Sequence, residues 1–219
     1  MIEKKLGISK EVKIPIGTTH LEGFLHLPPE AKGVVLFAHG SGSSRLSPRN
    51  QLVAHFLQEG NLGTLLFDLL TPEEEERDLL TRELRFNIPF LSERLIQATE
   101  WTQENSDTHS LSVGYFGAST GAAAALIAAA ELGPKVSAVV SRGGRPDLAG
   151  PHLTHVQAPT LLIVGGADHG VIDLNQDAFS LLSCKKKLEI VPNASHLFEE
   201  PGTLEEVGRM ATLWFQEYL

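Results

Sequence analysis

The chain has 219 residues, a length that suits a single α/β domain with one substantial core. Its hydrophobic fraction of 42% and charged fraction of 21% are ordinary for a globular protein. The 18 Lys and Arg residues are outnumbered by 27 Asp and Glu residues, and the formal charge of −9 argues against nucleic acid as a partner.

Cys184 is the only cysteine, so the chain can form no internal disulfide, which suits a reducing compartment. The first residues lack the apolar stretch of a signal peptide, and the longest apolar run, 122–130, is too short to cross a bilayer. We therefore expect a cytoplasmic protein without a membrane span. The sequence leaves open whether the protein forms a homo-oligomer.

Strand patterns begin with two segments at 12–16 and 21–27, joined by Gly17-Thr18-Thr19 as a hairpin turn. From residue 33 onward, short runs that are apolar throughout alternate with helical segments. We expect strands at 34–38, 64–67, 111–116, 136–140, 160–164 and 187–191. Strands that are apolar on both faces and separated by helices indicate a mostly parallel sheet covered on both sides. The sequence thus predicts one α/β domain over residues 1–219.

Start signals mark several of the helices. Ser47-Pro48 supplies an N-cap and an N1 proline for a helix that ends at Gly60. Thr71-Pro72 repeats this pattern, with Glu74 completing a capping box, and the acidic run 73–76 suits the positive end of a helix dipole. The pair Thr203 and Glu206 predicts the start of the last helix, whose apolar stripe indicates core packing.

The most informative motif is the G-x-S-x-G pentapeptide at residues 117–121, between an apolar strand and an alanine-rich helix. A serine at a tight strand-to-helix turn is held clear of the sheet, where a histidine and a substrate carbonyl can reach it. Gly117 and Gly121 suit this turn because they have no Cβ to clash where the strand and the helix come close. We expect Ser119 to be a nucleophile.

A serine hydroxyl needs a base, and the base needs a group that orients it. Asp168 follows the strand at 160–164, and His196 follows the strand at 187–191, so both fall on loops at the carboxyl ends of strands, together with Ser119. Asp168 has the alternative role of a turn residue or helix cap. His169 is the one rival base, but it adjoins the acid in sequence, which hardly allows the required geometry.

An oxyanion hole is also required, because negative charge develops on the carbonyl oxygen. We expect one donor to be the backbone N–H of Thr120. The second donor should come from the loop at 39–44, where the N–H of Ser41 is the first choice and Gly40 is the next candidate for contact with the substrate. A phosphate-binding loop is excluded there, because no Lys-Ser/Thr follows the glycines.

Four segments resemble the α/β-hydrolase superfamily, most closely its dienelactone hydrolase-like branch. They are HGSGSS at 39–44, GYFGASTGAAAAL at 114–126, LLIVGGADHGV at 161–171 and NASHLF at 193–198. The resemblance implies an α/β-hydrolase fold with Ser119 as nucleophile, Asp168 as triad acid and His196 as base, and with the Ser41 and Thr120 amides as oxyanion hole. True dienelactone hydrolases are known for a cysteine nucleophile, whereas this chain has serine.

We therefore expect a serine hydrolase that cleaves carboxylic esters through an acyl-enzyme, with a small-molecule ester as its partner. Thioesterase, lactonase and small peptidase remain alternatives, as does a non-catalytic binding or regulatory protein on the same fold. No metal or organic cofactor is expected. Large cap domains of the superfamily usually follow the strand that here ends near Val140, and only 159 − 140 = 19 residues run to Pro159. The site should be shallow and favour short acyl groups.

Two segments near the expected site allow two interpretations each. The first is Ser141-Arg142-Gly143-Gly144-Arg145-Pro146, in which Arg142 or Arg145 either holds a carboxylate or phosphate of the substrate or belongs to a solvated loop. The second, residues 69–89, contains a charged helix and forms either a small lid or a plain surface connection.

Overall fold

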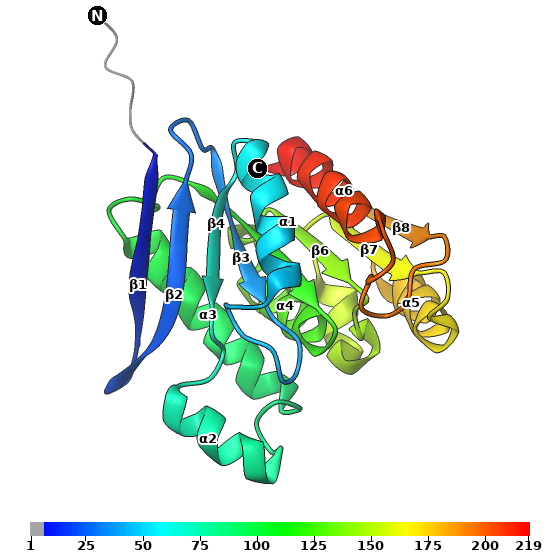
Figure 1. Cartoon of the computed structure of the whole chain (residues 1–219), viewed down its shortest axis with the longest axis horizontal. Coiled ribbons are helices and arrows are strands. Elements are labelled where there is room, and N and C mark those ends of the chain that lie inside the picture. The colour runs from blue at the N-terminus through cyan, green and yellow to red at the C-terminus, as the bar shows by residue number, and fades with distance from the viewer. Residues whose placement is uncertain (1–6) are drawn as a thin grey trace, which may run out of the picture.

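The computed structural model describes residues 7–219, which form an eight-stranded sheet in the order β1-β2-β4-β3-β5-β6-β7-β8 (Figure 1). The strands are β1 (Ile8–Ile16), β2 (Thr19–Leu27), β3 (Gly33–Ala38), β4 (Gly63–Phe67), β5 (Ser112–Ala118), β6 (Ala138–Arg142), β7 (Thr160–Gly165) and β8 (Lys186–Val191). The pairs β1–β2 and β2–β4 are antiparallel, and every other pair is parallel. The expected mostly parallel sheet is confirmed.

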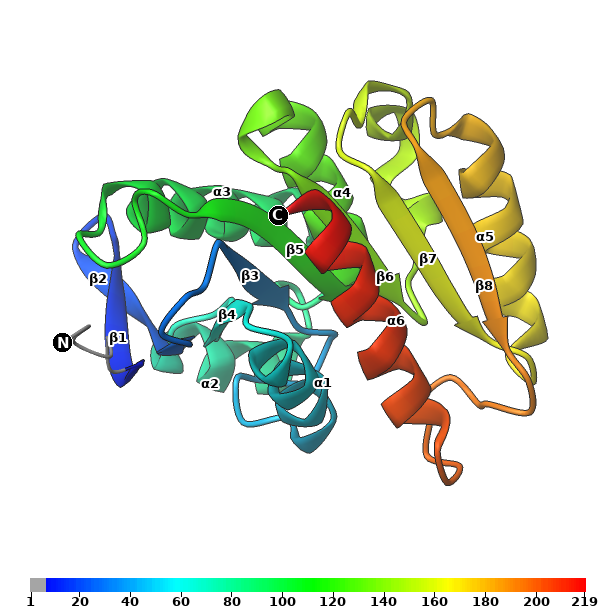
Figure 2. The same cartoon turned by 90° about the horizontal axis from the view of Figure 1, so that it is seen from above.

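Helices cover both faces of the sheet (Figure 2). The helices α1 (Pro48–Glu59) and α6 (Thr203–Tyr218) lie on one face, and α3 (Ile88–Glu104), α4 (Thr120–Leu132) and α5 (His169–Leu181) lie on the other. Each face has its own apolar core, because residues of a fully buried strand point alternately to the two helix layers. In β5, for example, Tyr115 packs in one core and Phe116 in the other.

The helix start signals read from the sequence are confirmed for α1 and α2 (Pro72–Thr81). The Ser47 hydroxyl accepts a hydrogen bond from the Asn50 N–H at 3.4 Å. Thr71 and Glu74 form the reciprocal capping box, with bonds of 3.2 and 2.9 Å. Thr203 is the first residue of α6 rather than its cap, because Gly202 occupies the N-cap with φ 83°.

One helix and the extent of one strand near the site differ from the sequence-based expectation. Helix α3, with 17 residues, was not among the expected elements; its start lies in Asn87-Ile88-Pro89, where the Asn87 side chain accepts from the N–H of Phe90. Strand β6 begins two residues later than expected and continues to Arg142. Arg142 belongs to the strand because it pairs with Ala118 of β5 and Ile163 of β7, so it lies at a strand end rather than in the following loop.

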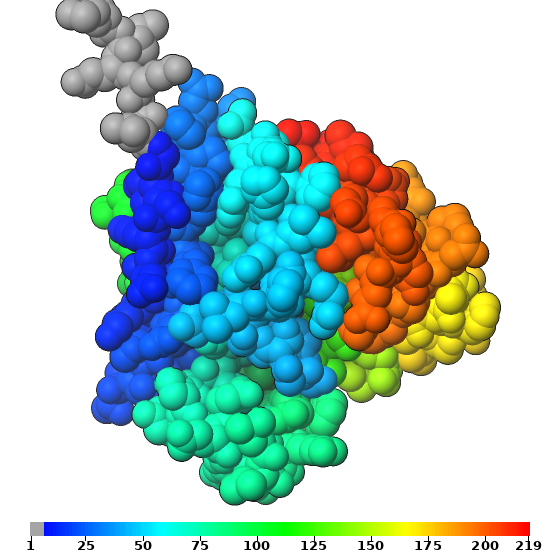
Figure 3. Space-filling model, in the orientation of Figure 1, coloured from blue at the N-terminus to red at the C-terminus, as the bar shows by residue number. Residues whose placement is uncertain are grey.

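The segments that leave the carboxyl ends of the strands differ in size. After β4 the chain forms α2, which projects beyond the strand ends and stands out as the lowest part of the space-filling view (Figure 3). Between β6 and β7 lies only the 3-10 segment η2 (Pro146–His155), as expected for a chain without a cap domain at this point. Within residues 7–219 no helix combines the length and apolar character that a membrane crossing requires.

Candidate active site

Ser119 lies in the sharp turn between β5 and α4, with φ 50° and ψ −120°. A residue other than glycine rarely adopts a positive φ, and such strain persists only where neighbours hold the backbone. Here the Ser119 N–H donates to the carbonyl of Arg142 at 3.3 Å, and its carbonyl accepts from the N–H groups of Ala122 at 3.1 Å and Arg145 at 3.0 Å. The turn is therefore fixed from the strand side and from the neighbouring loop.

The two glycines of the pentapeptide allow the close approach that this turn needs. A Cβ on Gly117 would lie 2.5 Å from the Ala122 Cα, and a Cβ on Gly121 would lie 2.1 Å from the carbonyl oxygen of Ala38. Real Cβ atoms do not approach backbone so closely, so only glycine fits at either position. The motif is thus explained by packing around Ser119.

Asp168 and His196 meet at the same edge of the sheet, after β7 and β8. The His196 Nδ1 lies 2.7 Å from the Asp168 Oδ2. Since a carboxylate only accepts, Nδ1 carries the proton and Nε2 is left as the acceptor nitrogen of the neutral ring. Asp168 occupies the N-cap position of α5, but its side chain makes no capping bond, so the alternative role as a cap does not account for it.

The rival histidine lies elsewhere. His169 is the first residue of α5 and is exposed. The side chains of His196 and Asp168 are 38% and 17% exposed, which leaves the imidazole edge open to a ligand. Of the two histidines considered as base, only His196 is bonded to the acid.

The loop after β3 packs directly against the Ser119 turn. A Cβ on Gly40 would lie 3.2 Å from the Ser119 Cβ and 3.2 Å from the Ala118 carbonyl oxygen. The Ser41 N–H donates a hydrogen bond of 3.0 Å to the hydroxyl of Thr120, a residue that is 5% exposed. The two amides expected to form an oxyanion hole are thus carried by residues that contact one another.

His39 is a residue of this site that the sequence analysis did not assign. It is 7% exposed; its Nε2 accepts from the Leu69 N–H at 3.1 Å, and its Nδ1 lies 3.0 Å from the Gly40 carbonyl oxygen. An accepting Nε2 and a donating Nδ1 define the neutral ring, and burial lowers the pKa of His39 below its ordinary value. His39 therefore connects the Gly40–Ser41 loop to the segment after β4, and its position directly after a buried strand was the available signal.

The segment 69–89 is tied down by a buried ion pair. Asp78, 1% exposed, accepts from the Nε of Arg85 at 2.5 Å and from the Leu84 N–H at 2.7 Å. An Nη of Arg85 would lie 3.5 Å from a Cβ placed on Gly42, so this segment reaches the Gly40–Ser41 loop. Through these bonds and His39, residues 69–89 form a wall beside the Ser119 turn.

The structure separates the two arginines that the sequence left equivalent. Arg145 forms a bidentate pair with Asp147, at 2.9 and 2.8 Å, and this carboxylate raises the pKa of Arg145. Arg142 is 6% exposed, and its guanidinium lies between the first turn of α1 and the ring of Phe198. Burial, with the nearby positive charge of Arg49, lowers the pKa of Arg142 to about 10, so it remains charged at neutral pH.

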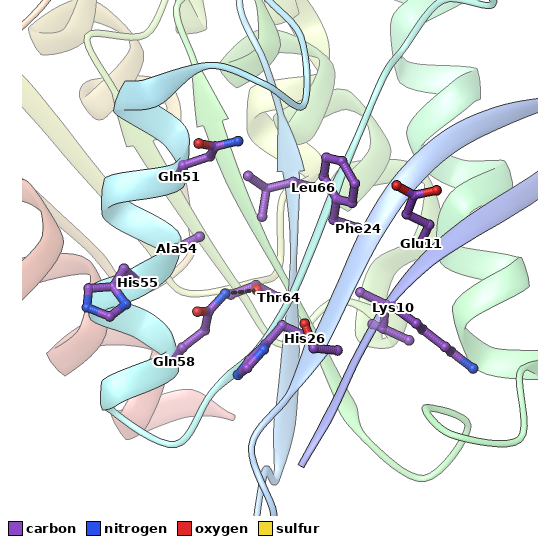
Figure 4. Close-up of a pocket in the computed structure, with 12 residues that line it drawn as sticks. Lys10, Glu11, Phe24, His26, Gln51, Ala54, His55, Gln58, Thr64 and Leu66 are labelled. Atoms are coloured by element: carbon purple, nitrogen blue, oxygen red, sulfur yellow. Dashed lines mark hydrogen bonds between the residues drawn. The ribbon is translucent and has the colours of Figure 1, made fainter.

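A second concave surface lies away from these residues. A groove of about 530 Å³ runs between α1 and strands β1, β2 and β4, with Phe24 and Leu66 in its floor (Figure 4). Gln58 and Thr64 are joined there by a hydrogen bond of 2.8 Å. None of the residues that line this groove belongs to the site around Ser119. Across residues 7–219, no group of three or more His, Cys, Asp or Glu side chains is arranged to hold a metal ion.

Comparisons with known proteins agree with this architecture. The model of the dienelactone hydrolase family matches residues 21–214. A dienelactone hydrolase from Anabaena variabilis has 59% identity and a TM-score of 0.96, over 97% of this chain and 99% of that one. A dienelactone hydrolase-like promiscuous phosphotriesterase from metagenomic libraries shares the fold, with 17% identity, a TM-score of 0.76, and coverage of 97% of this chain and 99% of that one.

Curated relatives are found in two strains of Mycobacterium tuberculosis, where they are named putative phosphoribosyl transferases. They are 55% identical over 210 residues, which are 96% of this chain but 46% of those proteins, so the chain spans about half their length. The family match covers most of the chain, and the Anabaena enzyme is similar over its whole length. The chain therefore belongs to the dienelactone hydrolase family and has the α/β-hydrolase fold.

Proposed function

We propose that this protein is a serine hydrolase that cleaves carboxylic esters with short acyl groups through a covalent acyl-enzyme. The observation that carries the proposal is the 2.7 Å bond between His196 and Asp168 at the sheet edge where the strained turn presents Ser119. A hydroxyl, an imidazole and a carboxylate in this order are the minimum that converts serine into a nucleophile near neutral pH.

The chemistry proceeds in two halves. His196 takes the proton from the Ser119 hydroxyl as this oxygen attacks the ester carbonyl, and it then gives the proton to the leaving alcohol. Asp168 holds the ring with Nδ1 protonated and stabilises the imidazolium that forms. Water then attacks the acyl-enzyme and gives a proton to His196. The bond between the acyl carbon and the Ser119 oxygen breaks, His196 returns the proton to this oxygen, and the acid is released.

The negative charge of each tetrahedral intermediate falls on the former carbonyl oxygen. The N–H of Thr120, at the start of α4, and the N–H of Ser41 are the proposed donors. In the free protein the Ser41 N–H donates to the Thr120 hydroxyl. To bind the oxyanion, this N–H either leaves the hydroxyl or donates to both oxygens.

The preference for short acyl groups follows from the segments around the site. The 3-10 segment η2 is the only element between β6 and β7, and α2 is held by the Asp78–Arg85 pair. A site walled by short segments buries few acyl methylenes, each worth about 0.8 kcal/mol.

The name carried by the mycobacterial relatives belongs to proteins about twice as long, and we do not extend that activity to this chain. The cysteine nucleophile of true dienelactone hydrolases is also absent, because residue 119 is serine. For these reasons we propose a general ester hydrolase and no particular substrate.

The decisive experiment combines an ester panel with active-site labelling. We expect purified protein to hydrolyse p-nitrophenyl acetate and to react with a fluorophosphonate probe at Ser119, located by mass spectrometry of tryptic peptides. Prior labelling should abolish hydrolysis in proportion to the fraction labelled. Hydrolysis that persists after complete labelling of Ser119, or a label on another residue, would contradict the proposal.

A further inference from the structure

Arg142 is a buried cation without a counter-ion. Its residue is 6% exposed, and among residues 7–219 no Asp or Glu lies within ion-pair distance of it. Its Nε is buried without a hydrogen-bond partner, and the one side-chain hydrogen bond of Arg142 within residues 7–219 is a long one of 3.5 Å from Nη2 to the Asn50 Oδ1. A buried charge normally has a partner of opposite sign, because its removal from water is costly.

The surroundings of Arg142 add further positive charge. Asn50 belongs to the first turn of α1, a helix of 12 residues whose N-terminus carries a partial positive charge. Arg49 lies in the same turn, and repulsion by its positive charge lowers the pKa of Arg142. The carboxylate of Glu199 lies 3.8 Å from the guanidinium of Arg49, but the Glu199 side chain is 65% exposed. The ring of Phe198 covers the guanidinium of Arg142 at 5.8 Å.

Arg142 also adjoins the proposed catalytic residues. Its carbonyl accepts from the Ser119 N–H at 3.3 Å, and Phe198 comes two residues after His196. A Cβ on the next residue, Gly143, would lie 3.0 Å from the His196 carbonyl oxygen. Arg142 therefore lies next to the Ser119 turn and the His196 loop, where a substrate of the proposed reaction would bind.

We propose that Arg142 and the first turn of α1 form a subsite for a phosphate group, so that the substrate is a carboxylic ester that also carries a phosphate monoester. Two guanidinium groups near the positive end of the α1 dipole together match a dianion better than the single charge of a carboxylate. The Nε of Arg142 is buried and has no partner among the described residues, so the guanidinium keeps unused donor capacity. The substrate class rests on the proposed ester hydrolysis, whereas the binding of phosphate at Arg142 does not.

Phosphate binding can be measured without any catalysis. Inorganic phosphate up to about 50 mM should raise the thermal unfolding temperature of the wild-type protein in a saturable manner, as expected for a ligand of the folded state. Arg142→Met should lose this saturable shift, while its stability without phosphate is unchanged or higher, because an uncompensated buried charge has been removed. Arg142→Lys keeps the charge without the fork and should bind phosphate at an intermediate level.

The same subsite should appear in kinetics. Phosphate should inhibit hydrolysis of p-nitrophenyl acetate, and more strongly than succinate at equal concentration. Arg142→Met should raise the inhibition constant for phosphate by about ten- to a hundredfold, the usual effect of one charge-assisted contact. Arg209→Met, which removes an exposed arginine of α6, is the matched control and should leave this constant unchanged.

Three results would overturn the subsite. The first is that phosphate does not raise the unfolding temperature of the wild-type protein in a saturable manner. The second is a rise of equal size in Arg142→Met, because phosphate stabilises any protein by exclusion from its surface. The third is that succinate inhibits hydrolysis more strongly than phosphate does. Absence of ester hydrolysis together with an Arg142-dependent phosphate shift would instead reject the proposed function and leave the phosphate subsite standing.

Discussion

The backbone N–H of Ser41 donates a hydrogen bond of 3.0 Å to the hydroxyl of Thr120, the residue that follows Ser119. This bond ties the loop after β3 to the turn after β5, two segments 79 residues apart in sequence. Since Gly40 also packs against Ser119, the loop and the turn form one unit. The position of the Ser41 amide, and with it the proposed oxyanion hole, therefore depends on a side chain that takes no part in proton transfer.

Replacement of Thr120 by valine keeps the shape of this side chain and removes its hydroxyl. We expect kcat for p-nitrophenyl acetate to fall by up to about tenfold with little change in KM, because one neutral hydrogen bond of the loop is lost. Thr120→Ser keeps the hydroxyl and should retain most of the activity. A rise of kcat in Thr120→Val would show instead that the hydroxyl competes with the oxyanion for the Ser41 amide.

Two substitutions at Ser119 distinguish the role of its hydroxyl in catalysis from the cost of its positive φ to stability. Ser119→Ala should remain folded and lose roughly a millionfold in turnover, as is typical for a triad nucleophile. Its free energy of unfolding, measured in urea, should equal that of the wild type, because alanine keeps a Cβ at the same φ of 50°. Ser119→Gly should be equally inactive but more stable by about 1 kcal/mol, since glycine accepts a positive φ without strain. Ser180→Ala, on the exposed side of α5, is the control for both assays.

Asp168→Asn tests the role of the carboxylate beside His196. The amide is nearly the same size, but it can present an N–H to the ring and so favour the wrong tautomer. Turnover should fall by up to about four orders of magnitude. KM should change little. Asp173→Asn, at an exposed position of α5, is the matched control, and an Asp168→Asn enzyme within tenfold of the wild type would refute this role.

His39 should make the folded protein less stable in mild acid. Burial lowers the pKa of His39 below the value of 6.5 expected for the unfolded chain. As the pH falls below 6.5, the unfolded chain therefore binds the proton first, and the free energy of unfolding decreases until the pH reaches the folded-state pKa. In urea titrations, His39→Gln should lose less stability than the wild type over this pH interval. His109→Gln, at an exposed position, should behave like the wild type, and identical slopes for all three proteins would contradict the prediction.

The acyl-chain preference can be measured with p-nitrophenyl esters from acetate to palmitate, below their micelle-forming concentrations. We expect kcat/KM to be higher for acetyl and butyryl than for long acyl chains, because a site bordered by the short η2 segment and the pinned α2 leaves added methylenes in water. An optimum at about ten or more carbons would reject the shallow site and indicate an acyl tunnel or a mobile lid.

The sequence by itself determined the order of the strands and the strand-end loops that carry Ser119, Asp168 and His196. Fully apolar strand segments can only be buried on both faces, so the parallel sheet followed from residues such as those of β3 and β7. Local signals at Ser47, Thr71 and Gly117 acted through neighbours only a few residues away, and for this reason they were readable. The extent of β6 was not readable, because Arg142 extends the strand through its pairing with β5 and β7.

Only the tertiary structure decided which of the two arginines has a counter-ion and which groups His39 contacts. Arg142 and Arg145 look alike in sequence, but the fold gives Arg145 a carboxylate and buries Arg142 without one. His39 is likewise one histidine among nine until its ring is seen to bridge Gly40 and Leu69. The contacts of Arg142 with Asn50 and Phe198, and that of His39 with Leu69, join distant parts of the chain, and no local pattern encodes those distances.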